Sequence, residues 1–310
     1  MTLKILYAGG DNRWPDYARP LPAAIEAAGL DAEIADDFAP GDVDYIVYAP
    51  NNDLTDFSPY TKAKAVLGLW AGVEQIVTNK TLTQPLTRMV DSGLTEGMVE
   101  WVTGHVLRHH LGMDAHIVNP DHEWRFSPPP LARHRPVTIL GLGELGTACA
   151  QALAALNFPV TGWSRSQKRI DGITCLAGED GLAEALSTAQ ILVLLLPQTP
   201  ATENLLNATR LAELPEGAVI LNPGRGPLID DDALLAGLDS GHIGHATLDT
   251  FRVEPLPQDH RYWSHPRVTV TPHIASETRA ETASEVIAEN IRRSEAGEPL
   301  LFRVDRTAGY

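Results

Sequence analysis

The sequence predicts an α/β protein made of two doubly wound parallel-sheet domains, and three observations support this fold class. The chain has 310 residues, a length typical of two domains, and its 44% apolar content is enough to bury a sizeable core. Short apolar runs recur along the chain and alternate with Ala- and Leu-rich stretches typical of helices. Several of these runs end in glycine or polar residues, as strands do where they enter loops.

The first third of the chain contains three predicted strands. Residues 3–7 form the first apolar run, and an Ala-rich helix follows from about residue 21 to 28, where Gly29 ends it. Residues 45–48 and 65–70 are the next two apolar runs, and each leads into a loop. Strands that end in loops in this way predict a small parallel-sheet domain.

A second series of strands occupies the rest of the chain. A helical stretch from about residue 95 to 111 leads into a polar, proline-rich passage ending at residues 128–130, and this change in composition marks a boundary region. The predicted strands beyond it are residues 137–140, 160–163, 191–196, 218–221, 246–248 and 268–270. Their alternation with helical stretches predicts a doubly wound sheet, whose ligands bind at the carboxyl ends of the strands.

Charge and composition limit the partners and the location of the protein. The formal net charge of −16 repels polyanions, so nucleic acid is not an expected partner. The longest unbroken apolar stretch, residues 191–196, is far shorter than the roughly 20 residues that cross a bilayer, and residues 1–20 do not resemble a secretory signal. We therefore expect a cytoplasmic protein without a membrane partner, in which Cys149 and Cys175 are buried thiols outside any disulfide framework.

A glycine turn follows the first strand of the second series. Gly141, Gly143 and Gly146 form a G-x-G-x-x-G motif between an apolar strand and an Ala/Leu-rich helix, the context typical of Rossmann dinucleotide binding. The three glycines permit, in order, the tight turn, the approach of backbone to the pyrophosphate, and close helix–strand packing. The helix N-terminus at Glu144 and Leu145 offers N–H groups to the anion. An ordinary tight βα turn is the alternative.

The residues at the end of the next predicted strand indicate whether NAD or NADP binds. An NAD-selective site has an acidic residue about 20 positions after the glycines, and none stands here. The strand ends instead in Ser164, Arg165 and Ser166, with Lys168 and Arg169 close behind. A carboxylate would repel a 2′-phosphate, whereas Ser164 and Arg165 suit it, with help from Lys168 or Arg169. We therefore predict NADP (NADPH), and a solvated basic surface loop is the alternative.

Arg225, Glu254 and His273 follow three successive predicted strands, which places all three at the carboxyl edge of the sheet. Reduction of a 2-oxo acid requires a cation near the carboxylate and carbonyl, and a general acid for the alkoxide. Arg225 suits the first role and His273 the second, while a hydrogen bond accepted from His273 by the Glu254 carboxylate would favour protonated His273 and fix its tautomer. Each residue alone has a structural explanation, as a strand-end cap, a turn residue or a satisfied histidine. Their combination downstream of the glycine turn favours catalysis.

These segments resemble the D-isomer-specific 2-hydroxyacid dehydrogenase family over nearly the whole chain. Within that family the sequence is most similar to the glyoxylate/hydroxypyruvate reductase A group, through Trp163-Ser164-Arg165-Ser166, Asp91-Ser92-Gly93-Leu94 and the terminal residues 304–310. The resemblance implies NADPH-dependent reduction of a small 2-oxo acid. It gives Arg225 the substrate-orienting role, Glu254 the support of the histidine, and His273 the acid/base role.

The resemblance also implies further site residues. The segment 196–202 belongs to the likeness, and within it Pro197 and Thr202 are expected to bind cofactor, while Asp249 is expected near the nicotinamide carboxamide. The loop after residue 69 would hold the substrate carboxylate through backbone N–H groups, which a glycine makes accessible. The residues expected to bind substrate, besides Arg225 and His273, are Tyr48, Trp70, Ala71 and Gly72.

The domain organisation that the resemblance implies is discontinuous. Residues 1–97 and 276–310 would form a flavodoxin-like split substrate domain, and residues 98–275 a Rossmann nucleotide-binding domain. Relatives dimerise through the nucleotide domain, so a homodimer is expected. Trp124 is expected either to cap the cleft of a neighbouring subunit or to be a buried hydrophobic anchor.

Three other interpretations remain open. A dinucleotide-sensing binding protein of the same fold would bind cofactor tightly with negligible turnover, and the intact set of three catalytic residues argues against it. An NAD-linked D-2-hydroxyacid dehydrogenase with a different substrate is disfavoured by the lack of an acidic residue at Ser164. A metal site is the third, because His105 and His109 share a helix face, with His110 beside them. No glutamate stands in H-E-x-x-H order, so we expect no metal and expect these histidines to pack or to lie on the surface.

Overall fold

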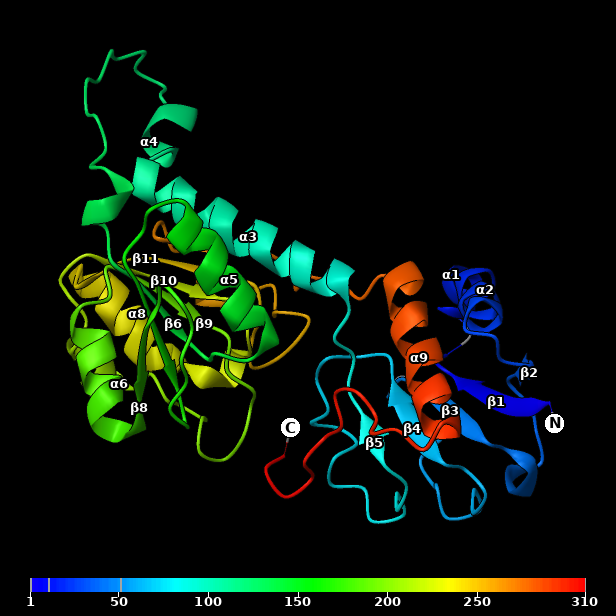
Figure 1. The fold of residues 1–310 in the computed structure, drawn as a ribbon. Coiled ribbons are helices and arrows are strands. Elements are labelled where there is room, and N and C mark those ends of the chain that lie inside the picture. The colour runs from blue at the N-terminus through cyan, green and yellow to red at the C-terminus, as the bar shows by residue number, and fades with distance from the viewer. Residues whose placement is uncertain (1, 11, 51, 310) are drawn as a thin grey trace. The chain divides into compact units, whose positions relative to one another are not determined.

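The chain folds into two compact units, which the computed structural model describes for residues 2–10, 12–50 and 52–309 (Figure 1). One unit consists of Met1–Leu94 and Glu277–Tyr310, and the other of Thr95–Ser276. We call them the split unit and the central unit. Each contains a parallel β-sheet, so the predicted fold class of two parallel-sheet α/β domains is confirmed. The assignment of substrate binding to one unit and of cofactor binding to the other stays a prediction.

The split unit contains a five-stranded sheet with the order β2-β1-β3-β4-β5, in which every neighbouring pair is parallel. Its strands are β1 (Leu3–Ala8), β2 (Ala32–Ala35), β3 (Tyr45–Tyr48), β4 (Ala65–Gly68) and β5 (Leu86–Thr87). Its helices are α1 (Trp14–Tyr17), α2 (Pro20–Ala27) and α9 (Ala280–Glu295). The strands β2 and β5 were not predicted, and the predicted run at residues 65–70 forms a strand only as far as Gly68.

The two faces of this sheet are covered differently. Alternate residues such as Ile5, Val47 and Leu67 pack against α1, α2 and α9, which lie together over one face (Figure 1). The intervening residues, among them Ile46 and Val66, pack against loops on the other face. Because successive side chains of a strand point to opposite faces, nearly continuous apolar runs are needed to fill both cores.

The central unit contains a seven-stranded parallel sheet with the order β12-β11-β10-β9-β6-β7-β8. Its strands are β6 (Val137–Leu140), β7 (Val160–Ser164), β8 (Thr174–Ala177), β9 (Ile191–Leu194), β10 (Ala218–Asn222), β11 (Ile243–Leu248) and β12 (Val268–Val270). Its helices are α3 (Ser92–Leu111), which begins in the split unit, α4 (Asp114–Ile117), α5 (Glu144–Ala155), α6 (Gly178–Ser187), α7 (Ala208–Ala212) and α8 (Asp231–Ser240). Helices α3 and α5 pack on one face of the sheet, and α6, α7 and α8 on the other.

The long helix α3 begins three residues before the predicted start. The carboxylate of Asp91 precedes it and accepts a hydrogen bond from the Leu94 backbone N–H at 2.8 Å, which satisfies one of the amide groups exposed at a helix start. The same carboxylate accepts a hydrogen bond from the Thr282 hydroxyl at 2.6 Å, at the start of α9. Asp91 therefore fastens together the starts of the two helices at which the chain leaves and re-enters the split unit.

Candidate active site

The three predicted catalytic residues lie on loops that follow neighbouring strands of the central unit. Strands β10, β11 and β12 are adjacent and parallel, so their carboxyl ends meet at one edge of the sheet. Arg225, Glu254 and His273 follow these strands in that order. The structure brings two of them into direct contact, because Nδ1 of His273 lies 2.7 Å from Oε2 of Glu254.

Glu254 is held by a second hydrogen bond. Its Oε1 accepts from the backbone N–H of Phe251 at 2.8 Å, while Oε2 faces His273. Because a carboxylate only accepts hydrogen bonds, the contact places a proton on Nδ1 of His273. The other ring nitrogen, Nε2, is then the one that can exchange a proton with a substrate oxygen, and about half of the His273 side chain is exposed.

The turn that carries His273 is built on Asp249, which is completely buried. One carboxylate oxygen of Asp249 accepts from the Thr271 hydroxyl at 2.6 Å and the Ile274 N–H at 2.9 Å, and the other accepts from the Ala275 N–H at 2.9 Å. His273 has φ of 54°, an unusual value for a residue other than glycine. The contacts of Asp249 within the chain support the histidine turn, and the place near the nicotinamide that the resemblance implies stays a prediction.

The loop that carries Arg225 depends on Asn222, which is 1% exposed. The Asn222 side-chain amide donates to the Arg225 carbonyl at 2.8 Å, and its Oδ1 accepts from the Gly224 N–H at 3.2 Å. A Cβ on Gly224 would lie 2.7 Å from the Leu194 carbonyl oxygen, so the glycine is required by close packing. Sequence reasoning missed Asn222, although its position directly after an apolar strand was a usable signal.

The glycine turn has the geometry of an anion site. Gly141 has φ of 109°, and a Cβ on Gly146 would lie 1.8 Å from the Gly141 carbonyl oxygen, so both positions require glycine. A Cβ on Gly143 would meet no atom within 4 Å, which leaves the turn open to a ligand. Helix α5 begins directly afterwards at Glu144 and Leu145, and its unpaired N–H groups suit a pyrophosphate.

The loop after β7 contains the residues predicted to bind a 2′-phosphate. The Ser164 hydroxyl, nearly buried, donates to the Ser166 carbonyl at 2.8 Å and bends the chain where the strand ends. Arg165, Ser166 and Lys168 are exposed. The Gln167 side chain donates to the Lys168 carbonyl within the loop and to the Cys175 carbonyl of β8, which ties the loop to that strand. These groups fit a 2′-phosphate, since residues 164–169 offer hydroxyls and cations and no carboxylate.

The segment after β9 contributes the other two predicted cofactor residues. The Thr202 hydroxyl donates to the Pro197 carbonyl at 2.7 Å and accepts from the Thr199 N–H at 2.8 Å. These bonds close the loop on itself at the carboxyl end of β9, beside the glycine turn that follows β6. The structure thus places both residues at the same sheet edge as the glycine turn.

The residues predicted to bind substrate from the split unit also gather in one place. Tyr48 ends β3 and packs edge-on against Phe57, with ring centroids 5.3 Å apart, and burial raises the pKa of its phenol. Tyr48, Trp70 and Gly72 line one small cavity of about 10 Å³, and Ala71 lies between the last two. The cavity adjoins the carboxyl ends of β3, β4 and β5, the edge at which parallel sheets bind ligands.

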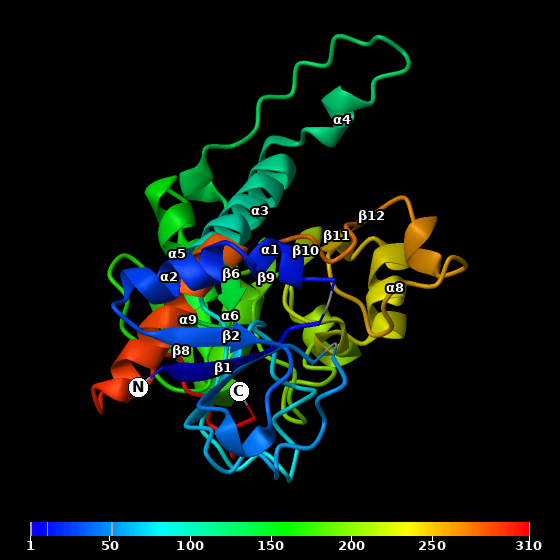
Figure 2. The same cartoon turned by 90° about the vertical axis from the view of Figure 1, so that its right-hand side faces the viewer.

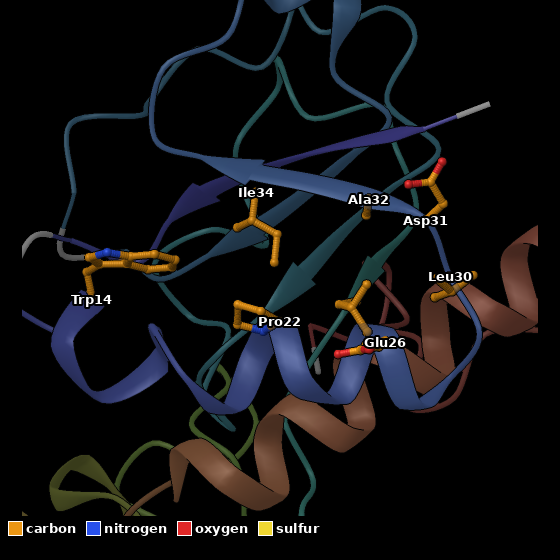
Figure 3. Close-up of a pocket in the computed structure, with 8 residues that line it drawn as sticks. Trp14, Pro22, Glu26, Leu30, Asp31, Ala32 and Ile34 are labelled. Carbon is orange, nitrogen blue, oxygen red and sulfur yellow. The ribbon is translucent and has the colours of Figure 1, made fainter.

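A larger hollow of about 300 Å³ lies elsewhere in the split unit, between the edge strand β2 and helix α2 (Figure 3). Trp14 closes one end, and Ile34 faces Pro22 across it. The two charged residues that line it, Glu26 and Asp31, are acidic. An anionic substrate would be repelled there, so this hollow does not belong to the predicted site.

The three histidines of α3 take part in packing. His109 Nε2 lies 2.9 Å from the Thr247 hydroxyl, and the His110 ring packs edge-on against Phe158 at 5.0 Å. The His105 ring packs against Trp101 at 4.3 Å. Within residues 2–10, 12–50 and 52–309, no three His, Cys, Asp or Glu side chains are grouped as metal ligands would be. In the same residues no helix has the length and apolar character of a membrane span.

Comparisons with known proteins agree on one family. The family model for the NAD binding domain of D-isomer specific 2-hydroxyacid dehydrogenases matches residues 104–275. The chain is 40% identical over 283 residues to glyoxylate/hydroxypyruvate reductase A of Serratia proteamaculans (strain 568), covering 87% of this chain and 90% of that protein.

Two solved structures are similar over their whole length. One is a D-isomer specific 2-hydroxyacid dehydrogenase from Xanthobacter autotrophicus Py2 in complex with NADPH and MES, at 38% identity and a TM-score of 0.92. The other is an NADPH-dependent glyoxylate/hydroxypyruvate reductase from Sinorhizobium meliloti in complex with NADP and sulfate, at 34% identity and a TM-score of 0.85. Both alignments cover 100% of each chain.

Proposed function

The chain belongs to the D-isomer-specific 2-hydroxyacid dehydrogenase family, and on that premise we propose that it reduces small 2-oxo acids of the glyoxylate/hydroxypyruvate type with NADPH. The observation that carries this proposal is the contact between His273 and Glu254, on strand ends next to the one that carries Arg225. A proton donor with a carboxylate behind it, beside a guanidinium, suits the conversion of a carbonyl into a hydroxyl group.

The cofactor assignment rests on this chain's own loops and on its relatives. NADPH, when bound, supplies the hydride that the carbonyl carbon of the substrate accepts. Gly141, Gly143 and Gly146 with the start of α5 would hold the pyrophosphate. Ser164 and Arg165 would hold the 2′-phosphate, and similar structures were solved with NADPH or NADP.

The protein groups then have separate tasks in the reaction. The Arg225 guanidinium pairs with the substrate carboxylate and polarises the carbonyl oxygen. As the carbonyl carbon is reduced, Nε2 of His273 gives its proton to that oxygen, and the product is the 2-hydroxy acid. Glu254 keeps Nδ1 protonated and stabilises the imidazolium before the transfer. The roles of Tyr48 and of residues 70–72 in holding the substrate carboxylate stay predictions.

A kinetic comparison tests this function. The purified protein is expected to oxidise NADPH with glyoxylate or hydroxypyruvate and to use NADH much less well. The matched variant combines Arg225→Ala with His273→Ala and is expected to lose turnover while still binding NADPH, which fluorescence titration measures. NADPH binding without turnover on any of a panel of 2-oxo acids would favour the sensor, and a preference for NADH would favour the NAD-linked enzyme.

We also propose a homodimer, in which a projecting arm of the central unit contacts the second copy. The arm, residues 112–131, extends away from the sheet of its own unit in both views (Figures 1 and 2). Its exposed apolar side chains include Trp124 at 95% and Phe126 at 88%. Apolar side chains gathered on a surface in this way mark interaction sites. The expectation of a buried anchor at Trp124 is wrong within the single chain, because no residue of its own unit covers it.

Cytoplasmic location and the lack of nucleic-acid or membrane partners stay predictions from composition.

A further inference from the structure

Arg252 lies on the loop that carries Glu254, two residues before it. Its guanidinium donates to the Asn204 side-chain oxygen at 2.6 Å and to the Ile229 carbonyl at 2.9 Å. It also forms ion pairs of 3.5 Å with Glu203 and with Asp231. One side chain thus joins the loop that carries Glu254 to two loops that are distant in sequence.

Both of these loops are connected to the segment after Arg225. The Asn204 backbone N–H donates to the Pro227 carbonyl at 2.8 Å, two residues beyond Arg225. Ile229 directly follows the short helical turn Gly226–Leu228, and Leu206 donates to the Leu228 carbonyl at 3.0 Å. The bonds of Arg252 therefore connect the backbone around Glu254 with the backbone that follows Arg225.

The same two segments also touch through their main chains. A Cβ on Gly226 would stand 2.0 Å from the Phe251 carbonyl carbon and 2.3 Å from the Arg252 nitrogen. No side chain fits between them, so the glycine allows the loop after Arg225 to lie directly on the loop before Glu254. The hydrogen bonds of Arg252 to Asn204 and Ile229 add a side-chain connection to this main-chain contact.

This contact matters because each catalytic group is oriented through its backbone. Glu254 accepts from the Phe251 N–H, so the position of its carboxylate follows the conformation of residues 251–254. His273 is oriented by Glu254 in turn. A shift of this loop relative to Arg225 would move the proton donor away from the carbonyl oxygen that the guanidinium holds, and small misplacements of reacting groups are costly in rate.

An ordinary surface ion pair is the competing explanation for Arg252. Its side chain is 35% exposed, and exposed ion pairs contribute little to stability. The bonds to Asn204 and to the Ile229 carbonyl are different, since they satisfy the planar fork of a guanidinium with fixed acceptors on two segments. Such a fork sets geometry even where its contribution to stability is small.

We infer that Arg252 is a positioning residue, which holds the Glu254 loop in register with the Arg225 loop so that His273 and Arg225 act on the same carbonyl group. The inference rests on the proposed function for its kinetic consequences. Its structural part is that the contact between His273 and Glu254 depends on Arg252. This part holds whichever substrate the enzyme uses.

The first experiment compares Arg252→Ala and Arg252→Lys with the unchanged enzyme. Arg252→Ala is expected to lower kcat about tenfold to a hundredfold, with an unchanged KM for NADPH. The high-pH limb of its kcat/KM profile is expected to move to lower pH, because a looser Glu254 supports the imidazolium less. Arg252→Lys is expected to recover part of kcat, since one ammonium reaches fewer of the four acceptors.

Two further variants make the test specific. Asn204 has φ of 49°, which glycine also adopts, so Asn204→Gly removes one acceptor without backbone strain. Its effect is expected to be smaller, in the same direction, and less than additive with Arg252→Ala. Arg261→Ala is the matched control, because Arg261 is an exposed arginine of the same unit that pairs with Asp239 at 3.0 Å. It is expected to leave kcat and the pH profile unchanged.

The inference is overturned if Arg252→Ala has no larger effect than Arg261→Ala, or if kcat falls only in proportion to lost folded protein while the pH profile stays in place. If none of the 2-oxo acids tested supports NADPH oxidation by the unchanged enzyme, the proposed function fails without deciding the inference about Arg252. A crystal structure of Arg252→Ala then decides the positioning role separately. An Nδ1 to Oε2 distance still at 2.7 Å, with the Arg225 loop unmoved, would refute it.

Discussion

The backbone N–H of His273 donates to the carbonyl of Asp249 at 2.8 Å, so the proposed acid/base residue is fastened to the end of the neighbouring strand. The Asp249 carboxylate adds three further hydrogen bonds to the same turn. This arrangement holds a histidine in a backbone conformation that it would rarely adopt alone. The cost of the conformation is offset by buried, charge-assisted hydrogen bonds.

Asp249→Asn tests this support. One carboxylate oxygen becomes an NH₂ group that cannot accept, so a buried N–H or hydroxyl of the turn loses its partner. We expect the free energy of unfolding to fall by about 1–3 kcal/mol and kcat to fall more than the folded fraction does. Chemical denaturation and NADPH oxidation measure the two effects. Asp232→Asn, at an exposed position in the first turn of α8, is the control and is expected to leave kcat unchanged and to lower the free energy of unfolding by less than about 1 kcal/mol.

Glu254→Gln tests the electrostatic support of the proton donor. The carbonyl oxygen of glutamine can still face Nδ1, but the negative charge is lost and the imidazolium becomes less favourable. In the proposed reaction His273 acts in its protonated form, so we expect activity to fall as pH rises. We expect the high-pH limb of kcat/KM to move to lower pH and kcat to fall about tenfold to a hundredfold. An unmoved limb would mean that Glu254 does not act on this proton.

Ser164→Asp tests the choice of cofactor. A carboxylate at the end of β7 suits the ribose hydroxyls of NADH and repels the 2′-phosphate of NADPH. We expect the ratio of kcat/KM for NADPH over NADH to fall by about tenfold to a hundredfold, since charge-assisted hydrogen bonds of this kind are worth about 1.5–3 kcal/mol. Arg133→Ala, which changes an exposed arginine elsewhere in the same unit, is expected to leave the ratio unchanged.

Substitutions in the arm test the homodimer. The double variant Trp124→Ser, Phe126→Ser removes the two most exposed aromatic side chains of the arm. We expect light scattering to give the mass of two chains for the unchanged protein and of one chain for the variant. Leu156→Ser, which changes a leucine that is 40% exposed on another surface, should keep the dimer. If light scattering gives the mass of a single chain for the unchanged protein, the result contradicts the proposal.

Two partly buried histidines, His109 and His245, predict a loss of stability in acid. Burial is the main cause that lowers the pKa of His109 to about 3 and that of His245 to about 4, against an ordinary value of 6.5. Between these lowered pKa values and 6.5, the two histidines bind more protons in the unfolded chain than in the folded one. The free energy of unfolding therefore decreases as pH falls below about 6.5. We expect the drop in Tm between neutral pH and about pH 5 to be smaller in His109→Gln, by scanning calorimetry. His134→Gln, at an exposed histidine, should behave like the unchanged protein.

The parts of the fold that could be predicted from sequence are those with a local cause. The glycine turn is largely local, because Gly141 has φ of 109° and a Cβ on Gly146 would meet the Gly141 carbonyl oxygen. Its close approach to the Leu195 carbonyl is the part that depends on a distant segment. The strands β6 and β10 were recognisable because each is mostly apolar and buried on both faces. By contrast, β5 has only two residues and β8 is a partly exposed edge strand, so neither gave a clear apolar pattern.

The candidate site divides in the same way. The three polar residues on adjacent strand ends were predictable from their spacing, whereas their supports were not. Asn222 was visible as a neighbour of Arg225, but its two hydrogen bonds depend on how the loop folds back. Arg252 acts through Asn204 and Ile229, which lie 48 and 23 residues away in the chain. Such partners become apparent only when the loops are placed in space.

The split unit is built from two separate stretches of the chain, which affects how it folds during synthesis on the ribosome. Helix α9 supplies Ala283, Ile287 and Ile291 to the core over its sheet, yet it is translated after the whole central unit. Until then the nascent β1, β3 and β4 lack part of the cover for one apolar face. The central unit, Thr95–Ser276, is contiguous and has its complete sequence available first. The emerging chain therefore carries a partly uncovered sheet for some 200 residues of elongation, a period in which chaperone binding and misassembly compete with folding.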